Sequence, residues 1–337
     1  MKATIRFLNN SGMKWGIPFM RLFSGEKVRL RLRDTGRTFV APALAIIGFL
    51  LIWSFCASKI TTSLGRLPGP AAVWEQANSL WHEHLAERKK ADVFYARQEE
   101  RNAKKYAKNP DAKINTVDFT GKPTYVDQII TSLKTVFMGF TIASIIALPI
   151  GIICGLSKTA MKAFNPLIQI FKPVSPLAWL PIVTMVVSAA YVTNNGFFAK
   201  SFVISAITVS LCSMWATLIN TALGVSSVNV DYINVAKVLQ LSPAKKTFKI
   251  LLPATLPLIF TGLRISLGVG WMVLIASEML AQNPGLGKFI WDEFQNGSSH
   301  SLARIMVAVF TIGIIGFILD RIMVELQKLV SFEKTSQ

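Results

Sequence analysis

Long apolar runs alternate with short charged connections along most of the chain. Six runs have about the 20 residues that an α-helix needs to cross a hydrocarbon core of ~30 Å. They are Phe39–Ala57, Ile129–Leu156, Phe164–Val192, Phe202–Val225, Leu256–Leu280 and Leu302–Val324. This pattern predicts an all-α, polytopic membrane protein with about six transmembrane helices.

The third run differs from the others because prolines interrupt it at Pro166, Pro173, Pro176 and Pro181. Proline removes a backbone donor and its ring clashes with the preceding turn, so a helix here should be kinked or broken. Lipid tolerates such a break only where protein or water satisfies the freed carbonyl groups. We therefore expect this segment to be bent and to face protein.

Basic residues beside the runs predict the orientation of the chain. Residues 1–38 hold nine Lys and Arg against two acidic residues, which by the positive-inside rule places the N-terminus in the cytoplasm. Six crossings then place residues 226–255, with four lysines, and the tail at 327–337 on the same side. Residues 58–128 fall outside despite their basic residues, because segments longer than ~60 residues translocate largely regardless of charge.

The polar segments flanking the runs have different characters. Residues 1–38 form a basic segment that mixes Lys and Arg with aromatic residues, as interfacial segments do; a partly disordered tail is the alternative. Residues 39–57 are the first transmembrane helix. Within 58–128, mixed charge predicts a soluble helix over Ala72–Lys108, closed by Asn109 and Pro110. We expect 58–128 to be an extracytoplasmic helical insertion.

Composition favours lipid as the main surroundings. Of the 337 residues, 52% are hydrophobic and 16% charged, whereas soluble domains carry about 25% charged residues. The net charge of +18 comes largely from basic residues beside apolar runs, where anionic lipid headgroups account for them better than nucleic acid. Cys56, Cys154 and Cys212 lack metal-ligand spacing and should be free thiols, and His82 and His84 alone do not predict a metal site.

The longest connection on the cytoplasmic side has helical periodicity on both sides of a turn at Ser242-Pro243. The apolar positions are Ile233, Ala236, Val238, Leu239, Phe248, Ile250, Leu251 and Leu252. They predict two short amphipathic helices, the second of which stops at Pro253 and Pro257, where the next run starts. An apolar knob rimmed by lysines can insert into a groove on a partner protein.

This connection resembles the EAA loop of ABC importer permeases, whose pattern is Glu-Ala-Ala-x3-Gly-x9-Ile-x-Leu-Pro. The register matches at Ala236, Ile250, Leu252 and Pro253. The departures from the pattern are Asn234 at the Glu, Val235 at the first Ala and Gln240 at the Gly.

Three further segments are similar to the nitrate/sulfonate/bicarbonate branch of these permeases: Lys172–Pro181, Phe260–Trp271 and Ala276–Leu280. Pro-Val-Ser-Pro at 173–176 is closer to its nitrate members. The resemblance covers roughly residues 125–330. It implies a type I importer permease fold, with a core permease domain at 129–326 that includes a coupling loop at 226–257.

The resemblance also implies a function and partners. The chain would be the permease subunit of an ATP-driven importer for a small inorganic anion, with nitrate expected and bicarbonate, cyanate or an alkanesulfonate such as taurine as alternatives. Its partners would be ATPase subunits, a periplasmic or lipoprotein substrate-binding protein, a second permease copy and lipid, in a bacterial cytoplasmic (inner) membrane. The residues expected to couple it to the ATPases are Asn234, Ala236, Leu239, Gln240, Leu241, Ser242 and Pro243.

No cofactor is expected on this chain itself. Gly285–Lys288 lacks the spacing and the Ser/Thr of a Walker A motif, so ATP and Mg²⁺ would bind the partner ATPases, and the chain would not be an enzyme. Two rival functions are an ATP-independent anion transporter, which inverted repeats would favour, and a nucleic-acid binder using the basic N-terminus. We see no convincing internal repeat, and nucleic-acid binding gives no reason for six spans.

Charged residues inside the apolar runs are the candidates for an anion path. A lysine or arginine at mid-bilayer costs about 2.5–3.5 kcal/mol on insertion scales, so such residues usually face the protein interior. The candidates are Lys172, Arg264 and Lys134, with Ser175 and Trp179 in the proline-broken segment. Lys134 and Arg264 lie near the ends of their runs, so snorkelling to the headgroups is the alternative for both.

Glu278 is the acidic residue near the other end of the run that contains Arg264. Its charge would repel an anion. We therefore expect a salt-bridge partner or a gate element there.

Overall fold

The computed structural model describes residues 28–62, 65–108, 116–191, 198–298 and 300–330. It is almost entirely helical. The helices are α3 (Val28–Lys59), α4 (Pro70–Lys108), α5 (Tyr125–Leu156), α6 (Lys158–Phe171), α7 (Pro176–Ala190), α8 (Lys200–Ser226), α9 (Val230–Val238), α10 (Pro243–Lys246), the π-helix η2 (Thr247–Leu251), α11 (Leu252–Ala281), α12 (Leu286–Asn296) and α13 (Ser301–Val330). A two-stranded antiparallel hairpin, β1 (Thr61–Thr62) with β2 (Gly65–Arg66), joins α3 to α4.

The expectation of about six membrane spans is confirmed. Among the described residues, five helices are long and apolar enough to cross a membrane, and the bent pair α6 and α7 makes a sixth if it counts as one span. The five are Val40–Lys59, Tyr125–Leu156, Lys200–Ser226, Thr247–Ala281 and Ser301–Val330. Helix α3 begins within the segment assigned to 1–38, while residues 1–27 and 331–337 lie outside the described residues.

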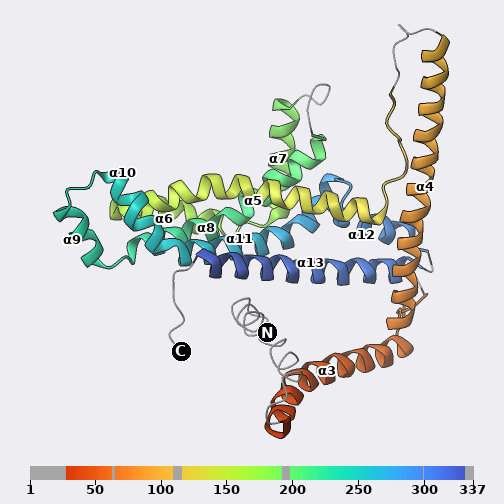
Figure 1. The fold of residues 1–337 in the computed structure, drawn as a ribbon, viewed down its shortest axis with the longest axis horizontal. Coiled ribbons are helices and arrows are strands. Elements are labelled where there is room, and N and C mark those ends of the chain that lie inside the picture. The colour runs from red at the N-terminus through yellow and green to blue at the C-terminus, as the bar shows by residue number, and fades with distance from the viewer. Residues whose placement is uncertain (1–27, 63–64, 109–115, 192–197, 299, 331–337) are drawn as a thin grey trace.

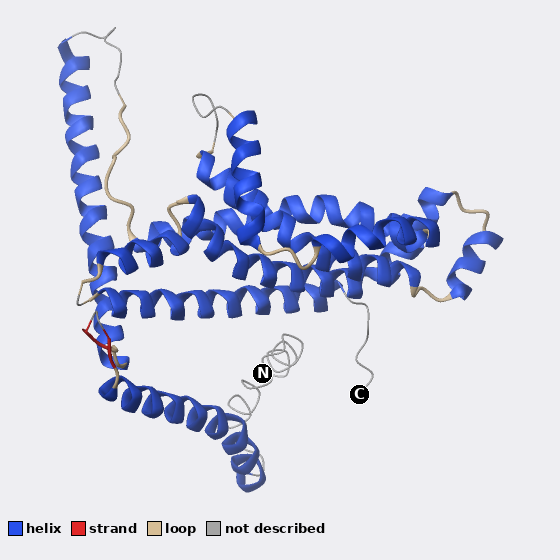
Figure 2. Cartoon of the chain, turned by 180° about the vertical axis from the view of Figure 1, so that it is seen from behind, coloured by secondary structure: helices blue, strands red, loops and turns tan. Residues whose placement is uncertain are grey.

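Helices α5, α8, α11 and α13 run along a common direction and form the bundle (Figure 1). Helices α9 and α10 lie at one end, which we call the knob end, and define the knob as residues 230–246. Helices α12 and α4 lie at the opposite end, and α4 extends beyond the bundle; the view from behind shows the same arrangement (Figure 2). The 226–257 and 58–128 segments are thus at opposite ends, as the expected topology requires.

Small residues bring the backbones of α5 and α8 into contact. Every fourth position along the buried face of α5 is glycine or alanine: Gly139, Ala143, Ala147 and Gly151. A Cβ atom at Gly151 would lie 2.9 Å from the carbonyl oxygen of Leu218 and 2.7 Å from the Cβ of Thr221, both on α8. Apolar burial does not drive helices together in lipid, so close packing of this kind holds spanning helices to each other.

The proline-rich segment is broken where the sequence predicted. Helices α6 and α7 meet at an angle of 101°, with the break between Lys172 and Ser175. The Ser175 hydroxyl accepts a hydrogen bond from the Leu177 backbone N–H (3.3 Å), and Pro176 begins α7, where a missing N–H costs nothing. Helix α7 then packs its buried side, which includes Leu180 and Val183, against α8.

The expectation that a separate second helix in the 226–257 connection stops at Pro253 and Pro257 is wrong. Helix α10 is a single turn, and the chain continues through η2 directly into α11, so neither Pro253 nor Pro257 separates the connection from the span. Pro253 lies directly after η2, as the second residue of α11. The π-turn before it widens the backbone where a proline ring would clash with the previous turn of an α-helix.

Substitution of Gly151 by alanine should destabilise the protein, because the added Cβ overlaps Leu218 and Thr221 on α8. The expected loss is about 1–3 kcal/mol, as for other overpacked sites. Thermal unfolding of the purified protein in detergent measures it. Gly313→Ala on α13, where a Cβ meets no atom within 4 Å, is the matched control and should be neutral or slightly stabilising. Equal effects of the two substitutions would contradict the role of backbone contact between α5 and α8.

Candidate functional site

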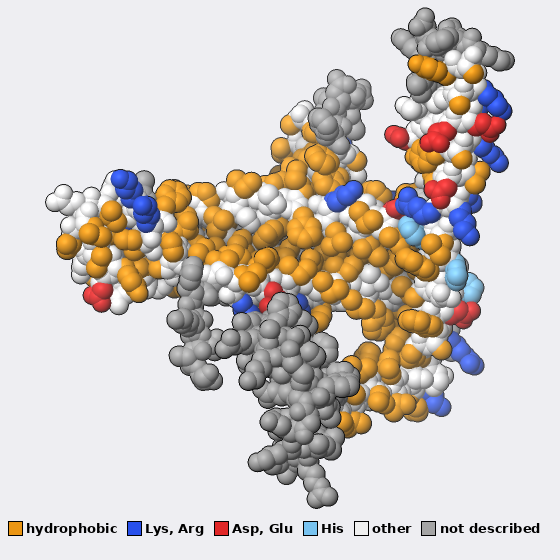
Figure 3. Space-filling view, viewed as in Figure 1, with side chains coloured by type: hydrophobic (Ala, Val, Ile, Leu, Met, Phe, Trp, Pro, Cys, Tyr) orange, Lys and Arg blue, Asp and Glu red, His pale blue; other side chains and the backbone are white. Residues whose placement is uncertain are grey.

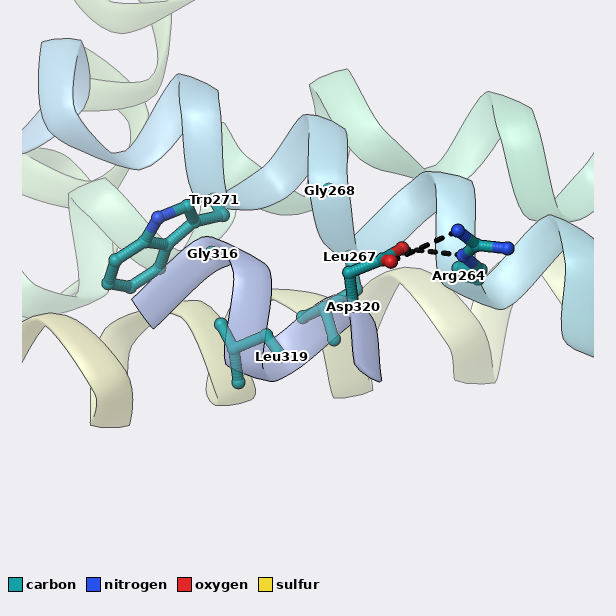
Figure 4. A pocket seen from close by; sticks show the side chains of 7 residues that line it. All are labelled: Arg264, Leu267, Gly268, Trp271, Gly316, Leu319 and Asp320. Carbon is teal, nitrogen blue, oxygen red and sulfur yellow. Dashed lines mark hydrogen bonds and ion pairs between the residues drawn. The ribbon is translucent and has the colours of Figure 1, made fainter. Parts of the chain in front are cut away.

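An arginine and an aspartate face each other across two spanning helices. Arg264 of α11 donates from Nε to Oδ1 of Asp320 on α13 (2.5 Å) and from Nη2 to Oδ2 (3.0 Å), so both carboxylate oxygens are bound (Figure 4). The side chains keep 39% and 34% of their surface exposed. A planar guanidinium matches a carboxylate in this two-pronged way, and a charge within a span is expected to find such a partner.

A cavity of ≈ 230 Å³ adjoins this ion pair between α11 and α13. Its lining residues are Arg264, Leu267, Gly268, Trp271, Gly316, Leu319 and Asp320 (Figure 4). Gly268 leaves the space open, since a Cβ there would meet no atom within 4 Å, and Trp271 is fixed by its indole N–H donating to the Ile312 carbonyl (3.0 Å). The cavity is therefore an apolar pocket with one cationic, two-pronged donor and one carboxylate.

The other path candidates lie elsewhere. Lys172 and Ser175 are exposed at the break between α6 and α7, and Trp179 of α7 is half-buried there, with its ring 5.7 Å from that of Phe171. Lys134 is exposed on α5. Neither lysine side chain has a hydrogen bond or ion pair with the described part of the chain, and none of these residues lines the cavity. The structure thus does not unite the candidates in one site.

The structure also changes the expected position of Arg264 and adds a partner that the sequence analysis missed. Arg264 lies midway along the continuous helical stretch Thr247–Ala281 rather than near one end. Its partner, Asp320, is an acidic residue within the last apolar run, which was the available signal. An ionisable residue inside a span is a candidate functional residue by default.

Glu278 has no cationic partner within the described residues, contrary to one of the two expectations for it. Its side chain is fully buried. The carboxyl group accepts hydrogen bonds from Ser132 Oγ (2.8 and 2.9 Å), the Gly287 backbone N–H (3.0 Å) and Asn283 Nδ2 (3.4 Å). It connects α11 to α5 and to the start of α12.

The knob presents apolar side chains beside lysines at its end of the bundle (Figure 3). Val238 and Leu239 are 82% and 62% exposed, whereas Ala236 is buried. Asn234 and Ser242 are exposed and Leu241 is half-buried, while the side chain of Pro243 lies outside the described part. Apolar side chains this exposed at the tip of a short helix indicate a contact surface.

Gln240, two residues after the end of α9, has a φ of +48°, in the left-handed region. An L-residue other than glycine costs roughly 1–2 kcal/mol in this conformation. Gln240 is the residue that stands at the glycine of the EAA pattern, so the structure gives a physical reason for glycine there. The Ser242 carbonyl then accepts from the Lys246 N–H (2.9 Å) and starts α10.

Comparison with known proteins gives consistent matches. The family model described as "Binding-protein-dependent transport system inner membrane component" matches residues 147–331. A bicarbonate transport system permease protein, CmpB of Synechocystis sp., is 35% identical over 86% of this chain and 88% of its own length. A nitrate import permease protein, NrtB of Synechococcus elongatus, is 37% identical over 60% of this chain and 69% of its own length.

Among solved structures, the MetNI methionine ABC transporter in an inward-facing conformation contains a similar chain. The TM-score is 0.53 at 14% identity, over 61% of this chain and 96% of that one. At this identity the likeness concerns the fold. It confirms the expected type I importer permease fold.

Removal of either charge of the Arg264–Asp320 pair should destabilise the protein more than removal of both. Arg264→Gln leaves Asp320 with only its longer contact to Arg321 (3.5 Å), and Asp320→Asn leaves Arg264 unpaired, whereas the double variant removes both charges of the pair. Residues in direct contact show interaction energies of about 0.5–3 kcal/mol in double-mutant cycles. Thermal unfolding of the four proteins gives this energy; strict additivity would show that the two side chains do not interact in the membrane-embedded protein.

Proposed function

Since this chain belongs to the family of binding-protein-dependent transport system inner membrane components, we propose that it is the permease of an importer for nitrate. As a member of that family it is a transport subunit and not an enzyme, and ATP is hydrolysed by separate ATPase subunits. The observation that carries the proposal is the position of Arg264, which lies between the spanning helices α11 and α13 beside an open cavity.

The bound carboxylate suggests the kind of ligand that Arg264 accepts. Asp320 offers the guanidinium two oxygen atoms of one planar group, and nitrate offers the same arrangement. The apolar walls of the cavity favour a weakly hydrated anion, and they strengthen the attraction of one cationic group. Nitrate would take the donors of Arg264 in place of Asp320 during passage. Three nitrate import permeases, each 37% identical, support this substrate.

Bicarbonate is the second candidate, because the CmpB permeases align over a larger share of this chain, 85–86% against 57–60% for the NrtB permeases. Bicarbonate is also planar and would bind Arg264 through two oxygens. It differs from nitrate by a hydroxyl donor, for which the Asp320 carboxylate is an acceptor within the same cavity.

The remaining parts of the proposed importer follow from the two ends of the bundle. The knob would seat in a cleft of the ATPase through Leu239 and Leu241, on the cytoplasmic side of a bacterial inner membrane. A substrate-binding protein would deliver the anion at the end of α12 and α4. A second copy would face the exposed side of Arg264 and complete the path, since one chain encloses the guanidinium on one side only.

Reconstitution with the ATPase subunits and the binding protein tests the substrate. We expect ATP-dependent accumulation of labelled nitrate in proteoliposomes, with no comparable uptake of labelled bicarbonate. Arg264→Lys keeps the charge but loses the two-pronged geometry, so it should raise the nitrate concentration for half-maximal uptake.

Complexes with a hydrolysis-deficient ATPase are the control and should not accumulate either anion. Accumulation of bicarbonate in preference to nitrate would overturn the proposal that nitrate is the substrate. Uptake that persists without ATP would overturn the proposed class of transporter.

Shortening the Leu239 side chain in the knob should uncouple the permease from the ATPase without removing it from the membrane. Leu239→Ala removes a side chain that is 62% exposed, so the chain itself loses little packing while the proposed ATPase contact is lost. Uptake should fall several-fold at unchanged abundance of the permease, measured by uptake and by immunoblot of membranes. Leu329, near the C-terminal end of α13, is 81% exposed. Leu329→Ala is the matched control and should transport normally. Normal uptake by Leu239→Ala would exclude the knob contact.

A further inference from the structure

Glu278 joins three parts of the chain at the bundle end opposite the knob. It lies in the last turn of α11, and both of its carboxyl oxygens accept a hydrogen bond from Ser132 on α5 or from the segment that follows α11. The Glu278 side chain is 0% exposed, so it contacts neither lipid nor bulk water. Its role is therefore defined by the groups it holds.

Those groups include the first free N–H donors of α12. The first four N–H groups of a helix lack partners within that helix. Gly285 precedes α12 and has no side chain that caps it. Instead the Gly287 N–H donates to Glu278 Oε2 (3.0 Å), and the Leu286 N–H donates to Ser132 Oγ (2.8 Å). Residues of α5 and α11 thus supply the cap of α12, and the positive end of its dipole faces the carboxyl group.

The segment between α11 and α12 lies directly on α11. A Cβ at Gly285 would overlap the Glu278 carboxyl group, and one at Gly287 would overlap the carbonyl oxygen of Ile275. Leu286 between them is fully buried in the core cluster that also contains Leu274. The start of α12 is therefore fitted closely to the last two turns of α11.

Helix α11 also reaches the knob without interruption. The stretch Thr247–Ala281 is one helical span of 35 residues that begins directly after α10. At its far end the chain turns at Gln282 (φ +56°) and continues into α12, whose Phe289 packs with Val73 of α4 and Val307 of α13. A displacement of the knob is thus connected through one continuous helical stretch to the elements at the opposite end.

We propose that Glu278 is a positioning residue that fastens α12 to α11, so that α12 follows α11 when the knob moves during the transport cycle. The proposal rests on the proposed importer function. Without the Glu278 contacts, the Gly287 N–H would lose its partner, and only the apolar packing of Leu286 and the short turn after Ala281 would hold α12 to α11, so that the movement would no longer be carried into α12. Glu278 acts through α12 and has no contact with the Arg264 cavity.

Labelling of reporter cysteines in the full complex tests this link. In a background with Cys56, Cys154 and Cys212 replaced by alanine, a single cysteine is placed at Phe294 of α12 or at Leu280 of α11. Both positions are exposed, by 58% and 44%. The labelling rate with a water-soluble maleimide is measured without nucleotide and after trapping with ATP and vanadate. With Glu278 intact, we expect the rate at each position to change several-fold between the two states.

In Glu278→Gln, one carboxyl oxygen becomes an amide donor that faces other donors, so the fastening should fail. The Phe294→Cys rate should then become the same in both states, while the Leu280→Cys rate still responds to nucleotide. Glu278→Ala, which removes the carboxyl group that bonds Gly287 and Asn283, should give the same result and serves if Glu278→Gln does not assemble. Ser277→Ala is the matched control, since this buried neighbour has no hydrogen-bond partner within the described residues.

A nucleotide response that persists at Phe294→Cys in Glu278→Gln or in Glu278→Ala would overturn the proposal. So would the loss of the response at both positions, because it would show that Glu278 supports α11 as a whole. No response at either position with Glu278 intact would instead refute the proposed coupling to ATP, and this inference with it.

Discussion

The hydrocarbon core of a membrane offers no hydrogen bonds, and this constraint decides where charge occurs in the spanning helices of this protein. Arg264 and Asp320 satisfy each other across α11 and α13. Glu278 is satisfied by a hydroxyl, an amide and a backbone N–H instead of a cation. Polar groups therefore join α11 to α13 through an ion pair and to α5 through hydrogen bonds without a cation.

Close apolar packing, rather than polar groups, joins α5 to α8. Glycine and alanine at every fourth position of α5 allow its backbone to approach α8, which no side-chain interaction replaces in lipid. Helix α11 packs against α8 in the same way, since a Cβ atom at Gly262 would lie 2.8 Å from the Cβ of Asn220 and 3.1 Å from the carbonyl oxygen of Ala216. Helices α5, α8 and α11 are therefore one closely packed unit.

The sequence predicted the spans and the break between α6 and α7 well, because length, apolar composition and proline are local properties. It failed where the outcome depends on neighbours. Pro253 and Pro257 were expected to end a helix, yet the helix continues through η2 and past both prolines. Helix α12 was not anticipated, since its 11 residues are capped by distant groups of α5 and α11.

The site was predicted only in part for the same reason. Arg264 was named as a candidate, but its partner Asp320 lies 56 residues away in sequence and is recognised only once α11 and α13 are side by side. Lys172 and Lys134 had the same charge and setting as Arg264 in the sequence, and the structure leaves both exposed. Charge within an apolar run thus identified the candidate residues. The packing of α11 against α13 showed that Arg264 is the candidate with a partner on another helix.

The π-turn η2 has a consequence for how the knob is aimed. Each residue of an α-helix turns the chain by about 100° around the helix axis, and a π-turn accommodates an additional residue without ending the helix. Insertion or deletion of one residue within 247–251 would therefore change the rotation of α10 relative to α11, while the residues of α11 keep their register within the bundle. The π-turn is thus one determinant of the direction in which the knob points.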